Sequence, residues 1–397
     1  MLHCAPPPPA PADRACVTDK TLLMVGLVSR KPGTNRGGSA ISIARLANHF
    51  VRQGIAVHLL RLPETPGEPL PEPLADAVAV HPFTQRRRGA MAAELWRHMR
   101  RTRPAALLAF DTRAGVLATT AARLPGAGVP AWVTPRNSLS GQMAGWSEAR
   151  IAKRRRLLNR VYRHSAGIIA ISAGQAADFR DVAGVPAGGD RIHVIHNSVI
   201  TPRTRELAAA PLEDPWLPRR PDSPPVILSA GRLAAQKDYP TLLEAFAILR
   251  RQRPARLLIL GEGPDRAALE AQAQALGIAA DLRLPGFVSN PYAYMAHADL
   301  FALSSRWEGF GNVLAEALAL GAPVVATDCP SGPAEILDGG RYGPLVPPGD
   351  APALAAAMAQ TLEDPLPRET LRAAGARYDI ETLGQRYLQV MGLLGHD

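Results

Sequence analysis

Two glutamates in the second half of the chain stand eight positions apart. Glu308 lies among glycines in the stretch RWEGFGN, and Glu316 lies within the apolar run NVLAEALALG. A carboxylate among alanines and leucines is costly to bury unless partners compensate for its lost hydration. Two hydroxyl donors, such as those of a ribose, would compensate Glu316, and Glu308 can accept hydrogen bonds from sugar hydroxyls. A capped helix with one ion-paired glutamate is the alternative interpretation.

Two cations precede these acids in the sequence. Arg232 and Lys237 follow the predicted strand VILSAG. In parallel α/β sheets, ligands bind beyond the carboxyl ends of the strands, so both cations can contact one polyanion there. A charge-assisted hydrogen bond to phosphate contributes roughly 1.5–3 kcal/mol. Two surface cations near a loop are the alternative.

Glycine-rich turns precede two predicted helices. Gly309 and Gly311 allow the backbone to approach a ligand closely, and Asn312 is a suitable N-cap for the helix that follows. A helix N-terminus offers free N–H groups and a partial positive charge, which both suit phosphate. In the first half, Gly37 and Gly38 precede the predicted helix SAISIARLANHFVRQG. That turn lacks the G-x-G-x-x-G pattern and is a weak signal by itself.

Predicted strands alternate with predicted helices in two successive blocks, which indicates an α/β fold with two parallel sheets, each covered by helices on both faces. The alternation stops in the proline-rich stretch 201–225 and restarts at residue 226. We therefore predict the following segments: a disordered Pro/Ala-rich N-terminus at 1–19, a first Rossmann-like domain at 20–200, a linker at 201–225, a second Rossmann-like domain at 226–380 and a final helical segment at 381–397.

The composition is that of a soluble protein, with 47% hydrophobic and 20% charged residues among 397. Its three cysteines, Cys4, Cys16 and Cys329, form no C-x-x-C pair, so we expect neither a disulfide framework nor a cysteine-built zinc site. The N-terminus lacks the basic start and apolar core of a signal peptide. No apolar run approaches the roughly 18–20 residues that span a bilayer. We expect a cytoplasmic protein.

The formal net charge is +10, and much of the surplus lies in two clusters, at Arg86–Arg103 and Lys153–Arg163. Such clusters attract the phosphates of nucleotides, nucleic acids or anionic lipid headgroups. A solvated helix face and a membrane-binding surface both remain open as interpretations. Aromatic residues make up 5% of the chain, which weakens the case for a nucleic-acid partner bound by base stacking.

Several metal and cofactor motifs are absent from the sequence. It contains no D-x-D, no H-E-x-x-H and no P-loop. The histidines of HVIH, His193 and His196, would point to opposite faces of a strand and make a poor metal site. We therefore predict no essential metal and no cofactor.

The chain resembles the family-four retaining glycosyltransferases, which have the GT-B fold of two Rossmann-like domains facing each other across a cleft. The segments GRLAAQKDYPTLLEAFAIL, LLILGEGPDR and SRWEGFGNVLAEALALGAPVVATDCPSGPAEIL carry the resemblance. The E-x7-E spacing from Glu308 to Glu316 is the signature of that family. The resemblance is strong over about residues 226–350 and weak over 60–165, where acceptor recognition would lie.

The resemblance implies a nucleotide-sugar donor bound mainly by the second domain. Arg232 and Lys237 would bind the diphosphate and stabilise the charge that grows on the leaving nucleotide. Glu316 would bind the ribose hydroxyls, and Glu308 would contact the donor sugar. Further donor contacts are implied for Gly37 and Gly38 across the cleft, for Phe287 and Val288 at the base, and for the backbone of Phe310, Gly311, Asn312 and Val313.

One stretch departs from the family pattern. Many relatives carry a histidine in the first domain near the reacting sugar, and the comparable stretch WVTPRNSLSGQM has Arg136 and Asn137 instead. These two residues are candidate contacts to the acceptor or the donor sugar.

The implied activity is transfer of a sugar from a nucleotide-diphosphate sugar to a glycan or lipid-linked glycan. The basic first domain, the absence of a spanning segment and the cytoplasmic signs suit an enzyme at the inner face of the cell membrane, so we expect a role in the biosynthesis of a cell-surface polysaccharide, such as a lipopolysaccharide or exopolysaccharide. The final helix would cross back to the first domain. A nucleotide-sugar epimerase or hydrolase of the same fold, and a basic nucleic-acid-binding protein, remain as alternatives.

Overall fold

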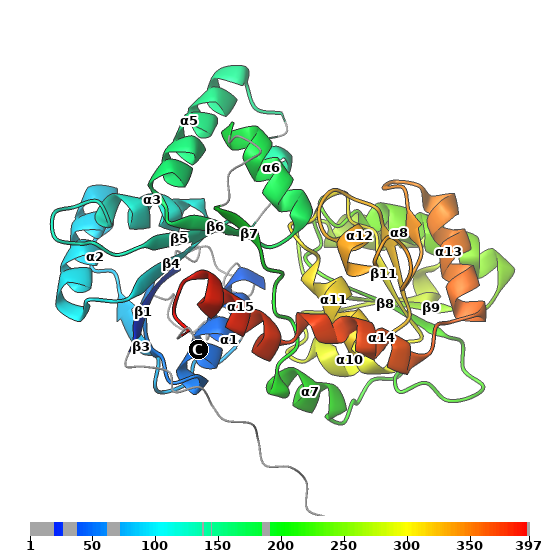
Figure 1. Cartoon of the computed structure of the whole chain (residues 1–397). Helices are drawn as coiled ribbons and strands as arrows, with labels where there is room; N and C mark the ends of the chain where they lie inside the picture. The colour runs from blue at the N-terminus through cyan, green and yellow to red at the C-terminus, as the bar shows by residue number, and fades with distance from the viewer. Residues whose placement is uncertain are drawn as a thin grey trace, which may run out of the picture.

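The computed structural model describes residues 20–26, 38–61, 72–136, 139–143, 145–184 and 191–394. Two α/β units lie side by side in it (Figure 1). We call the part that carries the first sheet the first domain and the part that carries the second sheet the second domain. The predictions for the N-terminal segment 1–19, for Gly37 and for Asn137 lie outside the described residues.

Within the described residues the first sheet has seven parallel strands in the order β3-β2-β1-β4-β5-β6-β7. All five residues of β4 are buried, as expected for a strand covered by helices on both faces. The strands are β1 (Thr21–Gly26), β2 (Ala56–Arg61), β3 (Ala79–Pro82), β4 (Ala106–Phe110), β5 (Ala131–Thr134), β6 (Gly167–Ala170) and β7 (Ile192–Val194).

The helices of the first domain cover both faces of this sheet, and one of them, α5, projects away from the rest of the molecule (Figure 1). They are α1 (Gly38–Arg52), α2 (Arg88–Thr102), α3 (Thr112–Ala121), α4 (Leu139–Met143), α5 (Glu148–His164) and α6 (Ala173–Ala183).

The second sheet has six parallel strands among the described residues, in the order β10-β9-β8-β11-β12-β13. Its strands are β8 (Val226–Ala230), β9 (Arg256–Leu260), β10 (Leu282–Gly286), β11 (Leu300–Leu303), β12 (Val324–Thr327) and β13 (Leu345–Val346). The helices around it are α8 (Tyr239–Gln252), α9 (Arg266–Ala275), α10 (Pro291–His297), α11 (Asn312–Ala319), α12 (Pro333–Ile336), α13 (Ala351–Glu363) and α14 (Arg368–Gly375), with short 3₁₀ turns at Ala279–Asp281 and Ala376–Tyr378.

The predicted α/β class with two parallel sheets is confirmed. The edge strands β3 and β13 were not predicted, because β3 has no buried position and β13 has only two residues, so neither has the apolar run of the central strands. Helix α7 (Pro202–Ala209) lies in the segment predicted as a linker. Thr201 caps it and Pro202 occupies its first turn, a combination typical of a helix start. Within the described residues, none of the helices is both long enough and apolar enough to span a membrane.

The chain passes between the two domains twice, and the two passages are hydrogen-bonded to each other. The amide of Val199 donates to the carbonyl of Tyr378 at 3.0 Å, and the amide of Ile380 donates to the carbonyl of Ile200 at 2.9 Å. After the second passage, α15 (Ile380–Val390) packs on α1 of the first domain (Figure 1). One apolar core therefore runs from the first sheet through this region into the second.

The contact between α15 and α1 depends on a residue without a side chain. Gly384 of α15 faces the buried ring of His49 in α1, and a Cβ at this position would overlap the imidazole. The ring is fully buried in the helix packing, so the small residue sets the distance between the two helices.

We expect Gly384→Ala to lower the free energy of unfolding by about 1–3 kcal/mol, because overpacking of a filled contact forces both helices to shift. Urea unfolding measures the change. Gly89→Ala is the matched control, since a Cβ there meets no atom within 4 Å. Equal stability of the two variants would contradict the predicted overlap.

Candidate functional site

The carboxyl ends of two neighbouring strands bring Lys237 and Glu308 together. Lys237 lies in the loop after β8, Glu308 lies in the loop after β11, and these strands are adjacent in the sheet. The ammonium Nζ of Lys237 lies 2.6 Å from Oε1 of Glu308. The hydroxyl of Ser305 donates to the same oxygen at 2.7 Å. The sequence pattern predicted both charged groups at the carboxyl ends of the strands, and the structure pairs them with each other.

Further polar contacts connect the two loops. The side-chain amide of Gln236 donates to the carbonyl of Trp307 at 2.9 Å and faces Oε2 of Glu308 at 3.5 Å. The guanidinium of Arg306 forms an ion pair with the buried carboxylate of Asp238. Because each loop is held by the other, the positions of Lys237 and Glu308 are fixed by the protein itself.

Arg232 lies in the same loop as Lys237 and is exposed. Among the described residues it has no ion-pair or hydrogen-bond partner. Gly231, which precedes it, has a φ of +157°, and a Cβ there would press on the Lys237 side chain. Within the described part of the chain, the loop thus presents one paired cation and one unpaired cation at the end of β8.

Glu316 is buried in α11 and faces a cation that the sequence did not predict. Nη1 of Arg45, in α1 of the first domain, lies 3.5 Å from Oε1 of Glu316. Burial raises the pKa of Glu316 to about 7, although the positive charge of Arg45 and its hydrogen bond act in the opposite direction. Arg45 stands among buried apolar positions of α1, and that cation on an apolar face is the signal that could have identified it.

The guanidinium of Arg45 is held from both domains. It donates to the carbonyl of Val199 at 2.9 Å and to the hydroxyl of Tyr292, in α10, at 2.6 Å. Glu72 of the first domain lies 3.7 Å from its Nε. Arg45 therefore fixes the position of Glu316 relative to the first domain.

The turn before α11 corrects one prediction. Asn312 was expected to cap this helix, but the N-cap is Gly311, whose φ of +97° favours glycine. Asn312 is the first helical residue, and its side-chain oxygen accepts a hydrogen bond from Asn197 of the first domain at 2.8 Å. Because Gly311 is the N-cap, the Asn312 side chain is not needed to cap the helix. It is therefore available for this contact between the domains.

Asn197 in turn contacts Arg136, the candidate acceptor residue. Nη1 of Arg136 donates to the side-chain oxygen of Asn197, and the guanidinium carbon lies 4.8 Å from the centre of the Phe110 ring. Burial lowers the pKa of Arg136, partly offset by Tyr387 and Asp111. Its Nε is buried with no hydrogen-bond partner among the described residues. Arg136 is thus a buried cation with one donor that has no partner among the described residues, and Asn197 connects it to Asn312.

The ring of Phe310 packs against both domains. It stacks on His196 at 5.3 Å and meets Tyr378 edge-on at 5.4 Å. Nε2 of His196 lies 3.1 Å from the Glu335 carboxylate, which also accepts hydrogen bonds from two amides at the start of α6. Burial alone would raise the pKa of Glu335, but these hydrogen bonds outweigh it and lower the pKa. The sequence did not predict His196 or Glu335 as members of this site.

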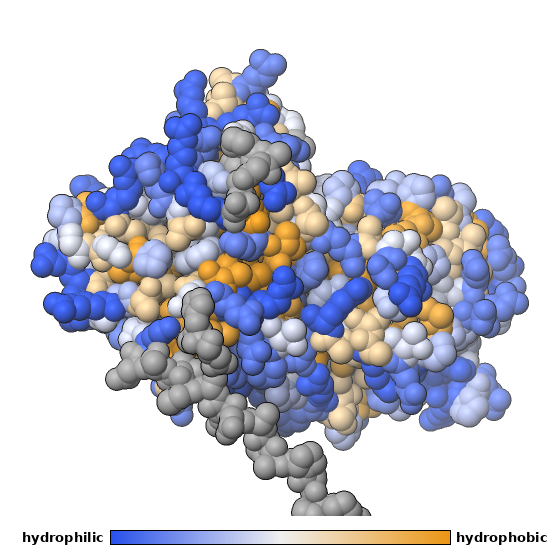
Figure 2. Space-filling model, in the orientation of Figure 1, coloured by the Kyte–Doolittle hydropathy of each residue, from blue (hydrophilic) through white to orange (hydrophobic). Residues whose placement is uncertain are grey.

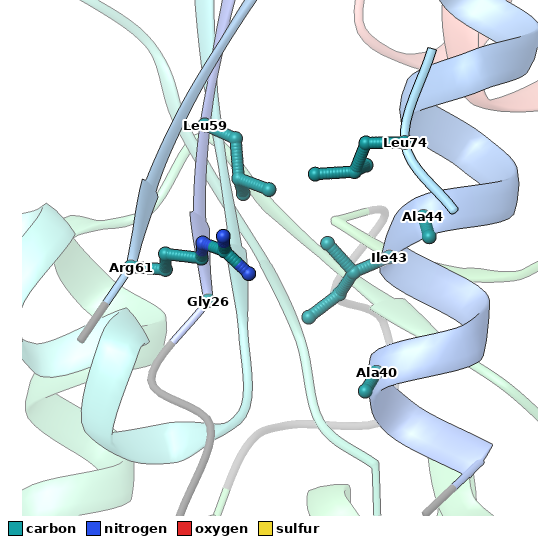
Figure 3. A pocket seen from close by; sticks show the side chains of 7 residues that line it. All are labelled: Gly26, Ala40, Ile43, Ala44, Leu59, Arg61 and Leu74. Carbon is teal, nitrogen blue, oxygen red and sulfur yellow. The ribbon is translucent and has the colours of Figure 1, made fainter. Parts of the chain in front are cut away.

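The remaining predicted donor contacts lie at the edges of this region. Phe287, after β10, is 50% exposed, and Val288 is half-buried. Val313 follows Asn312 in α11 and is half-buried. Gly38 is the first residue of α1. Near the start of α1, a hollow of about 10 Å³ lies at the carboxyl end of β1, lined by residues that include Gly26 and Ile43 (Figure 3). This volume is at the lower limit for one water molecule.

The raised pKa of Glu316 predicts a pH dependence of stability. Between its ordinary value of 4.5 and about 7, the folded protein binds more protons at this carboxyl than the unfolded chain. Stability at this site therefore falls as the pH rises through that window. Relative to Glu316→Gln, which has no proton to lose, the wild type should lose up to about 3 kcal/mol between pH 4.5 and 8.

Urea unfolding at several pH values measures this difference. The substitution also removes a partner of Arg45, and this shifts the free energy of unfolding by an amount that does not change with pH across the window. The exposed Glu363, substituted by glutamine, serves as the control. Parallel stability curves for the wild type and Glu316→Gln would show that burial does not raise this pKa.

Two family models match most of the chain. Residues 36–203 match the model described as Glycosyltransferase Family 4, and residues 213–378 match the model described as Glycosyl transferases group 1. Together they include the first-domain residues Arg45 and Arg136 and all of the second-domain residues described above.

Two relatives are named after specific transfer reactions or pathways. The lipopolysaccharide core biosynthesis glycosyltransferase LpsE of Rhizobium meliloti (strain 1021) is 33% identical over 205 residues, which are 50% of this chain and 57% of the relative. An N-acetylgalactosaminyltransferase of Campylobacter jejuni, whose acceptor is named as a diphospho-undecaprenol-linked saccharide, is 39% identical over 138 residues, which are 35% of this chain and 37% of the relative. The chain thus spans about half or less of the length of these relatives.

Solved structures with a similar fold match almost the full length. Anabaena Alr3699/HepE in complex with UDP has a TM-score of 0.72 at 21% identity, covering 94% of this chain and 99% of the other. Sucrose-phosphate synthase from Thermosynechococcus elongatus has a TM-score of 0.74 at 18% identity, covering 95% and 99%. This likeness confirms the predicted GT-B arrangement of two Rossmann-like domains.

Proposed function

Because the chain belongs to the GT-B glycosyltransferases of family 4 and group 1, we propose that it transfers a sugar from a nucleotide-diphosphate sugar to a glycan or lipid-linked glycan, with retention of the anomeric configuration. The pairing of Lys237 with Glu308 at the carboxyl ends of β8 and β11 is the observation that carries this proposal. It supports a ligand that presents negative charge to the lysine and hydroxyl groups to the glutamate at one place.

The chemistry of transfer requires a positive charge near the leaving group. Cleavage of the glycosyl C–O bond develops positive charge on the anomeric carbon and negative charge on the diphosphate. An ammonium has three donors, so Lys237 can bond to Glu308 and still donate to a phosphate oxygen. Arg232 lies exposed in the same loop and can bind the diphosphate from the solvent side. Fixed cations that face the developing charge lower the barrier to cleavage.

The rest of the donor extends along the end of the second sheet. We assign the ribose hydroxyls to Glu316, and the base to the region of Phe287, where an aromatic side chain is 50% exposed. The amides of Phe310, Gly311, Asn312 and Val313 stand at the start of α11, whose N-terminal partial charge favours a phosphate or a polar sugar. HepE was solved with UDP, so a uridine diphosphate sugar is the first donor to test.

The carboxylates of this site do not favour a divalent ion. Glu308 is paired with Lys237, and Glu316 faces Arg45. A divalent cation would have to displace a fixed positive charge in either place. We therefore propose metal-independent transfer, in which Lys237 and Arg232 neutralise the diphosphate.

The acceptor binds from the side of the first domain in this proposal. Arg136 has a spare buried donor and is connected through Asn197 to the start of α11, so it is suited to position an acceptor or sugar hydroxyl. Two of the similar proteins are named for lipopolysaccharide core synthesis and for a polyprenyl-linked acceptor. We propose an acceptor of this class, and a cytoplasmic enzyme that associates with the inner face of the membrane.

Replacing either cation tests the proposed mechanism. Arg232→Ala and Lys237→Ala should each lower the transfer rate by roughly 10²–10³-fold, because one donor to the developing charge is lost. Transfer from uridine, guanosine and adenosine diphosphate sugars to a lipid-linked glycan measures the effect, after a thermal-shift panel has identified the donor.

Arg251→Ala is the matched control, since Arg251 is exposed at the end of α8. Circular dichroism checks that the variants are folded. Wild-type rates in both variants would contradict the assigned role of the cations. Turnover of the donor that never needs an acceptor would favour the alternative of a nucleotide-sugar hydrolase.

Helix α5 carries the second basic cluster, and it projects from the first domain with strongly hydrophilic side chains (Figure 2). Lys153, Arg155 and Arg156 are exposed on it. Charge on an accessible helix attracts anionic lipid headgroups. The cluster Arg86–Arg103 adds further arginines in and around α2.

Substituting these three residues of α5 by glutamine should weaken binding to vesicles that contain phosphatidylglycerol by roughly 10–100-fold at low salt. Sedimentation with vesicles measures the bound fraction. The triple substitution of Arg203, Arg220 and Arg251 by glutamine removes the same charge from other exposed positions and is the control. Unchanged binding of the α5 variant would exclude this cluster as the membrane contact.

A further inference from the structure

Three histidines converge at the edge of the first sheet that is farther from the second domain (Figure 1). His58 lies on β2, His81 on the edge strand β3 and His98 on α2. In the parallel register, His58 pairs with Ala79 and His81 with Leu60, so the two strand histidines lie on the same face of the sheet. Helix α2 supplies His98 over that face.

The ring nitrogens of this cluster face one another. Nδ1 of His58 lies 3.2 Å from Nε2 of His98 and 3.1 Å from Nε2 of His81. All three ligand atoms lie within 4.8 Å of one another, and no other such group of potential ligands occurs in the described part of the chain. Nitrogens bound to one tetrahedral zinc at about 2.0–2.1 Å would be about 3.3 Å apart. The two separations from His58 are close to this spacing, and the His81 and His98 nitrogens lie within 4.8 Å of each other.

We propose that His58, His81 and His98 form a binding site for one divalent transition-metal ion of the kind that prefers imidazole, with zinc as the expected occupant. Three histidines and one open position are a known ligand set for zinc. His98 is buried, whereas His58 and His81 are half-buried. The metal can therefore enter from the side of the edge strand, and a water molecule can take the fourth position.

The environment of the rings leaves their nitrogens available as ligands. Burial lowers the pKa of His98 to about 4, with smaller contributions from the neighbouring histidines and Arg101. Burial likewise lowers the pKa of His58 and of His81. The rings are then neutral at pH 7, and neutral imidazole is the form that binds metals.

A hydrogen-bonded network without a metal is the competing explanation. Nη2 of Arg101 lies 3.3 Å from Nδ1 of His98, so that nitrogen accepts and the proton of His98 is on Nε2. Nδ1 of His58, with its one lone pair, can then accept from the N–H of His98 or from that of His81. Metal binding instead requires the proton of His98 on Nδ1 and the Arg101 side chain turned away. Arg101 is exposed and can turn into solvent.

The two explanations predict opposite effects of Arg101. In the metal site, Arg101 repels the cation and stabilises the wrong tautomer of His98, so Arg101→Gln should bind zinc more tightly than the wild type. In the network without a metal, this substitution gives no zinc binding. The proposed site lies in the first domain and involves none of the residues assigned to the donor, so the test is independent of sugar transfer.

Titration of the full-length protein with zinc chloride tests the proposal. The protein is freed of any affinity tag, treated with a chelator and dialysed before calorimetry. We expect one zinc ion per chain, and a rise in the midpoint of thermal unfolding as zinc is added, because a ligand that binds the folded state stabilises it. Absence of zinc binding would overturn the proposal.

Single substitutions identify the ligands. His81→Gln should weaken zinc binding by more than the roughly 10–100-fold that loss of an outer-shell partner causes, because it removes a direct ligand. His81 is half-buried, so this variant remains informative if His98→Gln fails to fold. The exposed His164, substituted by glutamine, is the control and should bind as the wild type does. Zinc binding that is equal in His81→Gln and the wild type would place the ion elsewhere and overturn the assignment.

Discussion

The arrangement of the two domains depends on a buried contact between Arg45 of the first domain and Glu316 of the second. Arg45 is almost wholly buried, and its guanidinium contacts the carboxylate of Glu316, the hydroxyl of Tyr292 and two carbonyls of the first passage between the domains. A buried ion pair adds little net stability compared with apolar packing, but removal of one partner costs about 3–5 kcal/mol. The pair therefore specifies which surfaces meet, more than how strongly they adhere.

The same principle extends to the neighbouring contacts. Asn197 bonds to Asn312, and Glu335 bonds to His196 and to the first amides of α6. Each of these bonds joins the first domain to a loop or helix start at the end of the second sheet. Groups proposed to bind the donor thus have the same neighbours as groups that hold the domains together. Binding at this end of the sheet and the relative position of the domains are physically coupled.

The sequence predicted the features that depend on local pattern. Alternating apolar runs identified the two parallel sheets, and the loops after β8 and β11 were recognised as the place for Lys237 and Glu308. Partners from distant segments were not predictable, because Arg45 and Glu316 are 271 positions apart and no periodicity relates them. The role of Asn312 was misassigned because the left-handed conformation of Gly311 is not visible in the residue types alone. The three-histidine cluster likewise depends on strand register and on how α2 crosses the sheet.

The two passages of the chain between the domains have a mechanical consequence. Because residues 199–200 and 378–380 are hydrogen-bonded side by side, the two passages form one backbone joint between the domains. A hinge rotation at this joint changes few backbone dihedral angles and can preserve these bonds. Elsewhere, the bonds from Ala173 and Gly174 to Glu335 would open, and water can replace them at a small net cost for each. A change in the angle between the domains would therefore keep the backbone bonds of the joint and break these side-chain contacts, together with those of Arg45 to Glu316 and of Asn197 to Asn312.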